Sequence, residues 1–143
     1  MTTSQTSAPL AATADRTAAA RPLRTFLALD AAVTAANGLI YLVAAGPVGD
    51  LLDLSPGFLR GIGVFLTVYG ALVALLASRP VPSATATKAV IEANVLWAVA
   101  SVATAVFGWF DPNTVGTVWI PLQAAVVAAF AVLQFNSLRA LGR

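Results

Sequence analysis

The sequence predicts an all-α integral membrane protein, a four-helix bundle with both termini cytoplasmic. Only 10% of its 143 residues are charged and 59% are hydrophobic, whereas a soluble domain carries about 25% charged residues. Four stretches of 18 to 27 residues contain no charge, and about 18 apolar residues are enough to cross a bilayer as a helix. A third observation, the one-sided placement of the basic residues, predicts the orientation.

The N-terminal segment is rich in Ala, Thr and Ser and contains two prolines. Such a segment has few large apolar side chains to bury, so folding does not offset its loss of entropy. We therefore predict a disordered cytoplasmic tail over residues 1–23 and a four-helix transmembrane domain over residues 24–140.

The first span is expected over residues 25–45. Three arginines precede it, as in a secretory signal peptide, but its apolar stretch is longer than the 7–15 residues of a cleaved signal. A retained anchor is therefore favoured. The span is expected to end at Gly46-Pro47, because proline has no N–H to donate to the helix.

The second and fourth spans share a start signal. A link over residues 48–54 leads to Ser55-Pro56, and Asp111-Pro112 repeats this pattern before the fourth span. Serine or aspartate at the N-cap followed by proline at the first helical position favours a helix start. The remaining predicted spans are residues 56–78, 88–110 and 112–137.

The four spans resemble two related helical hairpins. Asn37 and Asn94 each follow an alanine and precede a leucine by two residues. Two spans per half predict a parallel repeat whose axis lies along the membrane normal. True duplication and shared apolar composition remain equal alternatives.

Seven of the eight basic residues lie on one side of the predicted spans. They are Arg16, Arg21, Arg24, Arg79, Lys88, Arg139 and Arg143, whereas Arg60 lies on the other side. The positive-inside rule assigns the basic side to the cytoplasm. The predicted location is the bacterial inner (plasma) membrane, crossed several times, and the bias argues against a dual-topology small multidrug transporter.

The absence of histidine and cysteine narrows the possible chemistry. Cys/His zinc sites, iron–sulfur clusters and Ser-His or Cys-His dyads all need one of these residues. We expect no catalytic residues, no metal and no cofactor, and we predict that the chain is not an enzyme. Its net charge of +2 does not favour nucleic acid as a partner.

A polar stripe follows the first span. Asp30, Thr34, Asn37 and Tyr41 are spaced at i, i+4, i+7 and i+11, which places them on one helix face. Lipid disfavours such a face, so it should point to the bundle interior or a water-filled cleft. In one interpretation Asp30 is a proton or cation site. In the favoured one it forms a structural ion pair with a base, either Arg24, Arg79 or Lys88.

Three further polar residues complete the candidate ligand-binding or intramembrane polar set. Glu92 lies near the start of the third span, where the helix dipole stabilises a carboxylate. Asn94 suits interhelical hydrogen bonds, which is the favoured interpretation for Asn37 as well. Gln123 follows Pro121, and this kinked segment either bounds a small-molecule pocket or is a kink without a ligand.

The second span carries a face of small residues. Small residues allow two helix backbones to approach closely within a membrane, so this face is interpreted as a packing surface. Its members are Gly63, Thr67, Gly70, Ala74 and Ser78.

Three segments, residues 37–42, 54–60 and 90–97, carry a resemblance. With them the chain resembles a group of uncharacterised small four-span integral membrane proteins of high-GC bacteria. The similarity covers residues 25–140. It implies a fold and a membrane location, and it implies no activity.

The function expected from these observations is that of a non-catalytic inner-membrane accessory or interaction protein. It would pack with itself as a homo-oligomer or with a larger membrane complex in the lipid bilayer. One alternative is a small transporter or carrier of a lipophilic or cationic ligand. Another is a quinone- or lipid-binding subunit of a membrane enzyme.

Overall fold

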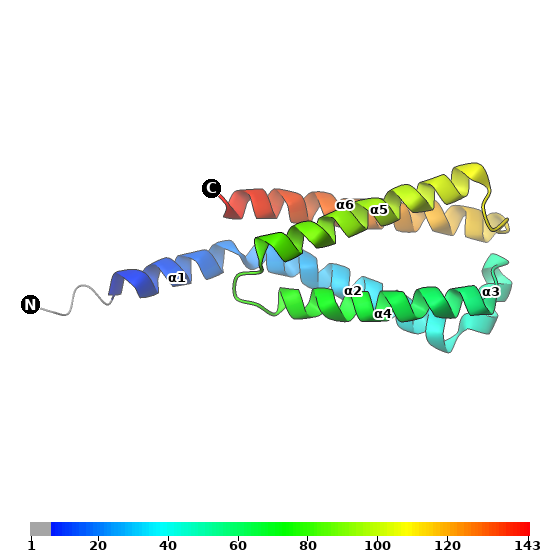
Figure 1. The fold of residues 1–143 in the computed structure, drawn as a ribbon, viewed down its shortest axis with the longest axis horizontal. Coiled ribbons are helices and arrows are strands. Elements are labelled where there is room, and N and C mark those ends of the chain that lie inside the picture. The colour runs from blue at the N-terminus through cyan, green and yellow to red at the C-terminus, as the bar shows by residue number, and fades with distance from the viewer. Residues whose placement is uncertain (1–6) are drawn as a thin grey trace, which may run out of the picture.

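The computed structural model describes residues 7–143, which form six helices in an elongated bundle (Figure 1). Their bounds are α1 Ser7–Ala19, α2 Arg21–Val43, α3 Ala45–Leu52, α4 Pro56–Ala77, α5 Ala84–Phe107 and α6 Thr114–Leu141. Of these, α2, α4, α5 and α6 are long and apolar enough to cross a membrane. The predicted all-α, four-span membrane fold is thereby confirmed.

The four long helices form two antiparallel hairpins, α2 with α4 and α5 with α6 (Figure 1). The connection between α4 and α5 lies at the same end of the bundle as the C-terminus and the start of α2. The short helix α3 and the connection between α5 and α6 lie at the opposite end. We call these the basic end and the α3 end.

Glycines on α4 bring it close to α2. A Cβ atom added at Gly63 would lie 2.8 Å from the carbonyl oxygen of Gly38, and one added at Gly70 would lie 2.9 Å from the Cβ of Ala35. Both glycines are buried. The small-residue face of the second span therefore packs against α2, at a separation that no larger side chain permits.

The two hairpins contact each other at both ends. At the basic end a core cluster joins α2, α4 and α5 through the buried residues Leu27, Val73 and Val90, and Leu138 of α6 packs against it. At the α3 end the side chain of Asn113 donates to the carbonyl oxygen of Leu51 over 2.8 Å. Side-chain packing at one end and hydrogen bonding at the other hold the hairpins together.

The N-terminal segment corrects the predicted disordered tail. Residues 7–19 form α1, and α2 begins at Arg21 rather than at residue 25. Six of the 13 residues of α1 are alanine, the residue with the highest helix propensity, and this preference needs no buried face. The part of the prediction that concerns residues 1–6 lies outside the described residues.

Helix starts agree with the prediction in one case and differ in another. Ser55 caps α4, its hydroxyl oxygen accepting from the backbone N–H of Phe58. The fourth span, however, is capped by Asn113, whose side chain accepts from the N–H of Gly116 over 3.0 Å. Asp111 lies before this cap with a φ of 45°, because the connection turns through left-handed backbone before α6 begins.

Other boundaries also differ from the sequence-based prediction. The first span ends at Val43, and the expected stop at Gly46-Pro47 lies inside α3, because proline is tolerated in the first turn of a helix. The expected link over residues 48–54 is largely helical, since α3 continues to Leu52 and ends at Asp53 in the left-handed conformation. The third span begins at Ala84, four residues earlier than predicted, because Ser83 caps it by accepting from the N–H of Ala86.

Candidate functional site: a cavity between the hairpins

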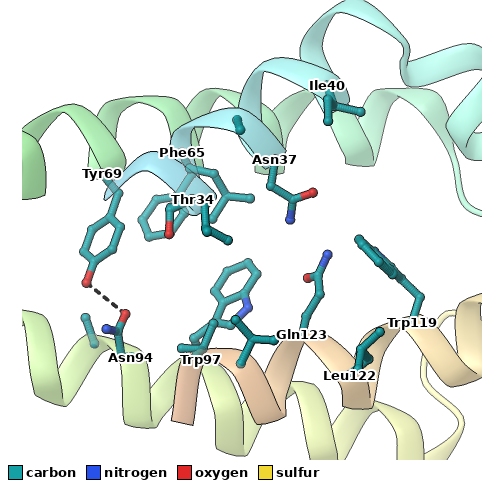
Figure 2. Close-up of a pocket in the computed structure, with 16 residues that line it drawn as sticks. Thr34, Asn37, Ile40, Phe65, Tyr69, Asn94, Trp97, Trp119, Leu122 and Gln123 are labelled. Carbon is teal, nitrogen blue, oxygen red and sulfur yellow. Dashed lines mark hydrogen bonds between the residues drawn. The ribbon is translucent and has the colours of Figure 1, made fainter. Parts of the chain in front are cut away.

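A cavity of about 390 Å³ lies between the two hairpins, in the middle of the bundle. Figure 2 shows side chains of α2 and α4 on one side of it and side chains of α5 and α6 on the other. Its main apolar walls come from Val33, Ile40, Phe65, Trp97, Leu122 and Val126, and its polar groups come from Thr34, Asn37, Tyr69, Asn94 and Gln123. A volume of this size accommodates a small organic molecule.

The cavity opens through the side of the bundle. Phe65, Ile40 and Leu122 all line it, yet each remains more than half exposed, at 53%, 52% and 52%. In a membrane this side faces lipid. This side of the cavity would then be open to the bilayer rather than to water.

A network of hydrogen bonds around Asp30 lies next to the cavity, towards the basic end. Oδ2 of Asp30 accepts from the amide nitrogens of Asn94 and Gln134, both over 2.7 Å. Its Oδ1 accepts from the hydroxyl of Thr34 over 3.1 Å. The Asp30 side chain is only 1% exposed, and its three donors suit an ionised carboxylate, which can only accept.

The hydrogen-bond partners of Asp30 are all neutral, so the expected ion pair between Asp30 and a base is wrong. Among the described residues, the groups that donate to its carboxylate are a hydroxyl and two amides. Arg24, the base nearest in sequence, instead donates through Nε to the carbonyl oxygen of Ala77 over 3.2 Å. Asp30 is therefore held by α2, α5 and α6 without an ion pair, because its side chain points into the bundle, where the amides of Asn94 and Gln134 meet it.

The network continues to the cavity wall. The Tyr69 hydroxyl donates towards Oδ1 of Asn94 over 3.2 Å, as Figure 2 shows, and lies 3.3 Å from the carbonyl oxygen of Val90. Thr34, Tyr69 and Asn94 all line the cavity. One hydrogen bond thus separates Asp30 from the cavity surface.

A second polar cluster lies on the other side of the cavity, towards the α3 end. The hydroxyl oxygen of Tyr41 accepts from Nε1 of Trp119 over 2.9 Å and from Nε2 of Gln123 over 2.8 Å. These bonds join α2 to α6. Beyond them lies a second cavity of about 220 Å³, and it shares Trp97, Trp119 and Gln123 with the first.

Asn37 presents its amide to the cavity without a protein partner among the described residues, so the interhelical hydrogen bond expected for it is not formed, whereas the one expected for Asn94 is. Figure 2 shows the amides of Asn37 and Gln123 facing each other across the space. Within residues 7–143, no side chain or backbone group forms a hydrogen bond with the Asn37 amide, whereas that of Gln123 is held by Tyr41. An amide in an apolar cavity gains from any ligand that hydrogen-bonds to it.

The structure places the sequence-predicted polar residues in three different environments. Thr34, Asn37, Asn94 and Gln123 line the main cavity, and Tyr41 lines the second one. Asp30 lies behind the wall. Glu92 lies outside the site altogether, exposed on α5, because it is two positions from Asn94 and therefore on a different face of the helix.

Sequence reasoning missed two members of the site. Gln134 is completely buried and follows Gln123 by 11 residues, the spacing of three helical turns, so the pair marks one polar face of the fourth span. Tyr69 lies within the second span beside the small-residue face. A tyrosine hydroxyl needs a hydrogen-bond partner inside a membrane. The residue type therefore predicts that this side chain points into the bundle.

The fold and the cavity define a four-span membrane protein with a small-molecule-sized site between two hairpins. Comparison of the chain with models of protein families, with curated proteins and with solved structures finds no match. Among the described residues there is no group of three or more His, Cys, Asp or Glu side chains placed to hold a metal ion. The cavity and the groups beside it offer the amides and hydroxyls of polar side chains, several aromatic rings and the carboxylate of Asp30.

Proposed function

We propose that the protein is a non-catalytic binding protein, a small carrier that takes up a lipophilic molecule from the bilayer. The observation that supports this proposal is the side-opening cavity of about 390 Å³ with the unpartnered Asn37 amide inside it. Packing alone would fill such a space, because membrane helices associate mainly through close contact. Binding is thus a better account of the cavity than a purely structural role.

The chain's own tryptophans provide an assay. Trp97 and Trp119 line the cavity, whereas Trp109 lies in the connection after α5. A Trp109→Phe variant in detergent therefore leaves fluorescence from the cavity alone. Bromobenzene, a lipophilic heavy-atom quencher, should quench it with a saturable component above the linear background from detergent partitioning.

A matched pair of substitutions tests whether the saturable component comes from the cavity. Ala93→Phe adds a ring to the cavity wall, whereas Ala71→Phe adds the same ring to the exposed surface of α4. We expect Ala93→Phe to remove saturable quenching and Ala71→Phe to retain it. Quenching without a saturable component in the parent protein, or equal quenching in both variants, would contradict the proposal.

A second candidate function is the accessory or interaction protein expected from the sequence. The observation in its favour is Glu92, an exposed carboxylate on α5 among the exposed apolar residues Val95, Leu96 and Val99. A charge on a lipid-facing surface is costly unless a partner covers it. Under this function, Glu92→Gln should lose a co-purifying protein or the homo-oligomer. The cavity variant Ala93→Phe should retain it.

We further propose the bacterial inner membrane as the location, with both termini cytoplasmic, in keeping with the resemblance to small membrane proteins of high-GC bacteria. The distribution of basic residues supports it. Arg24, Arg79, Lys88 and Arg139 belong to helix ends or connections at the basic end, and Arg60 belongs to the start of α4 at the α3 end. Basic flanks are retained on the cytoplasmic side of spans.

A further inference from the structure

We propose that the ligand of the cavity is a lipophilic organic cation, a quaternary or protonated amine on an apolar body. This inference rests on the proposed binding function and names the ligand class. Three features of the cavity wall favour positive charge: a buried carboxylate without a base, the orientation of the hydroxyls and amide around it, and a row of aromatic rings.

The first feature is the uncompensated charge of Asp30. Its carboxylate is 1% exposed and held by neutral donors, and none of the residues that line the cavity is basic. Its field therefore extends into the cavity, where the low surrounding dielectric weakens screening. A cation there gains the interaction without displacing a protein base.

The second feature is the direction of the hydrogen bonds. Thr34 uses its only proton towards Asp30, and Tyr69 uses its own towards Asn94 and Val90. The amide nitrogen of Asn94 likewise donates towards Asp30 and Gln134. Because the protons are used in these bonds, the oxygens of Thr34 and Tyr69 have only lone pairs left for a ligand in the cavity, and lone pairs attract positive charge.

The third feature is a row of aromatic rings. Phe65 stacks with Tyr69 at a centroid distance of 5.9 Å and with Trp97 at 6.0 Å, and all three line the cavity. Aromatic faces carry negative quadrupole potential and attract cations, tryptophan most strongly. Quaternary ammonium groups are bound in this way in aromatic sites.

Two probes of equal shape separate charge from apolar contact. They are 4-bromobenzyltrimethylammonium and its neutral carbon analogue 1-bromo-4-neopentylbenzene, and both quench tryptophan. For each variant the ratio of the two dissociation constants is compared with that of the parent, so that detergent partitioning cancels. We expect the parent to bind the cation more tightly than the neutral probe. Asp30→Asn should reduce this preference for the cation at least about tenfold, since a nearby charge acts strongly in a low-dielectric site.

The control for Asp30→Asn is Asp50→Asn, which removes the same charge from the exposed surface of α3 and should leave the ratio unchanged. A second pair covers the case in which Asp30→Asn fails to fold. Phe65→Leu removes one aromatic ring from the cavity wall, and Phe107→Leu removes an exposed ring outside it. We expect only Phe65→Leu to reduce the preference for the cation, by several-fold.

The outcomes distinguish this inference from the proposed function. Saturable binding of the neutral probe with equal or greater affinity than the cation would overturn the inference and leave the binding function intact. A cation preference that survives both Asp30→Asn and Phe65→Leu would also overturn it. Absence of saturable binding by either probe would contradict the binding function itself.

Discussion

The amide nitrogen of Gln134 lies 2.7 Å from Oδ2 of Asp30, although the two residues are 104 positions apart in the chain. The same oxygen accepts from Asn94, so one carboxylate joins α2 to both helices of the second hairpin. Gln134 and Asp30 are buried almost completely. This contact is one of several polar links between the hairpins inside the span region, together with the bonds from Trp119 and Gln123 to Tyr41.

Replacing Gln134 with leucine should destabilise the bundle by about 1–2 kcal/mol, because a buried carboxylate loses one of its donors. Thermal unfolding in detergent measures the effect. A double-mutant cycle with Asp30→Asn isolates the contact, and a coupling energy of about 0.5 kcal/mol or more is expected. Additive effects of the two substitutions would show that the bond contributes nothing.

Substitution of Gly63 by valine should separate α2 from α4. A Cβ there meets the carbonyl oxygen of Gly38 at 2.8 Å, whereas one at Gly61, half a turn away, meets nothing within 4 Å. We expect Gly63→Val to cost about 2 kcal/mol or more, as overpacking does, and Gly61→Val to be nearly neutral. Similar melting temperatures for the two variants would contradict the packing described.

Asn113 has two roles that can be separated by substitution. Its side-chain oxygen caps α6, and its side-chain nitrogen donates to Leu51 of α3. Asn113→Asp retains the cap and loses the donor, whereas Asn113→Ala loses both. Loss of a cap typically costs about 1 kcal/mol, so Asn113→Ala should reduce stability more than Asn113→Asp. Amide hydrogen exchange in the first turn of α6 should rise chiefly in Asn113→Ala. The reverse order would rule out the capping role.

Cysteine labelling tests the orientation, because the chain has no native cysteine. Ser83 lies between α4 and α5, and Asp53 follows α3 at the other end. In intact cells an impermeant thiol reagent should label Asp53→Cys and leave Ser83→Cys unlabelled until the cells are opened. Labelling of Ser83→Cys alone would reverse the proposed topology.

Removal of residues 2–19 should leave the bundle intact. α1 has no buried residue, whereas Leu23 and Leu27 at the start of α2 belong to the core. Arg21 and Arg24 remain as the positive flank that favours correct insertion. A truncated protein with a lowered melting temperature, or one absent from the membrane fraction, would show that α1 stabilises the fold.

The four spans could be predicted from the sequence alone, because the length and apolarity of a membrane helix are properties of a contiguous segment. It also placed the polar stripe of α2 inward, since Asp30 and Tyr41 are buried. Helix ends depend on more than the local sequence, as the cap of α6 illustrates. Asn113 and Asp111 are both good N-cap residues, and only the left-handed turn before α6 selects Asn113.

The contacts of the inward polar groups depend on how the two hairpins pack together. An ion pair between Asp30 and a base was plausible from sequence distance, but the carboxylate meets Asn94 and Gln134 instead, because the second hairpin packs its polar face against α2. The cavity is likewise a property of packing. The hairpins are joined at both ends and leave space in the middle, and no local pattern of residues encodes the separation of two helices that are distant in the chain.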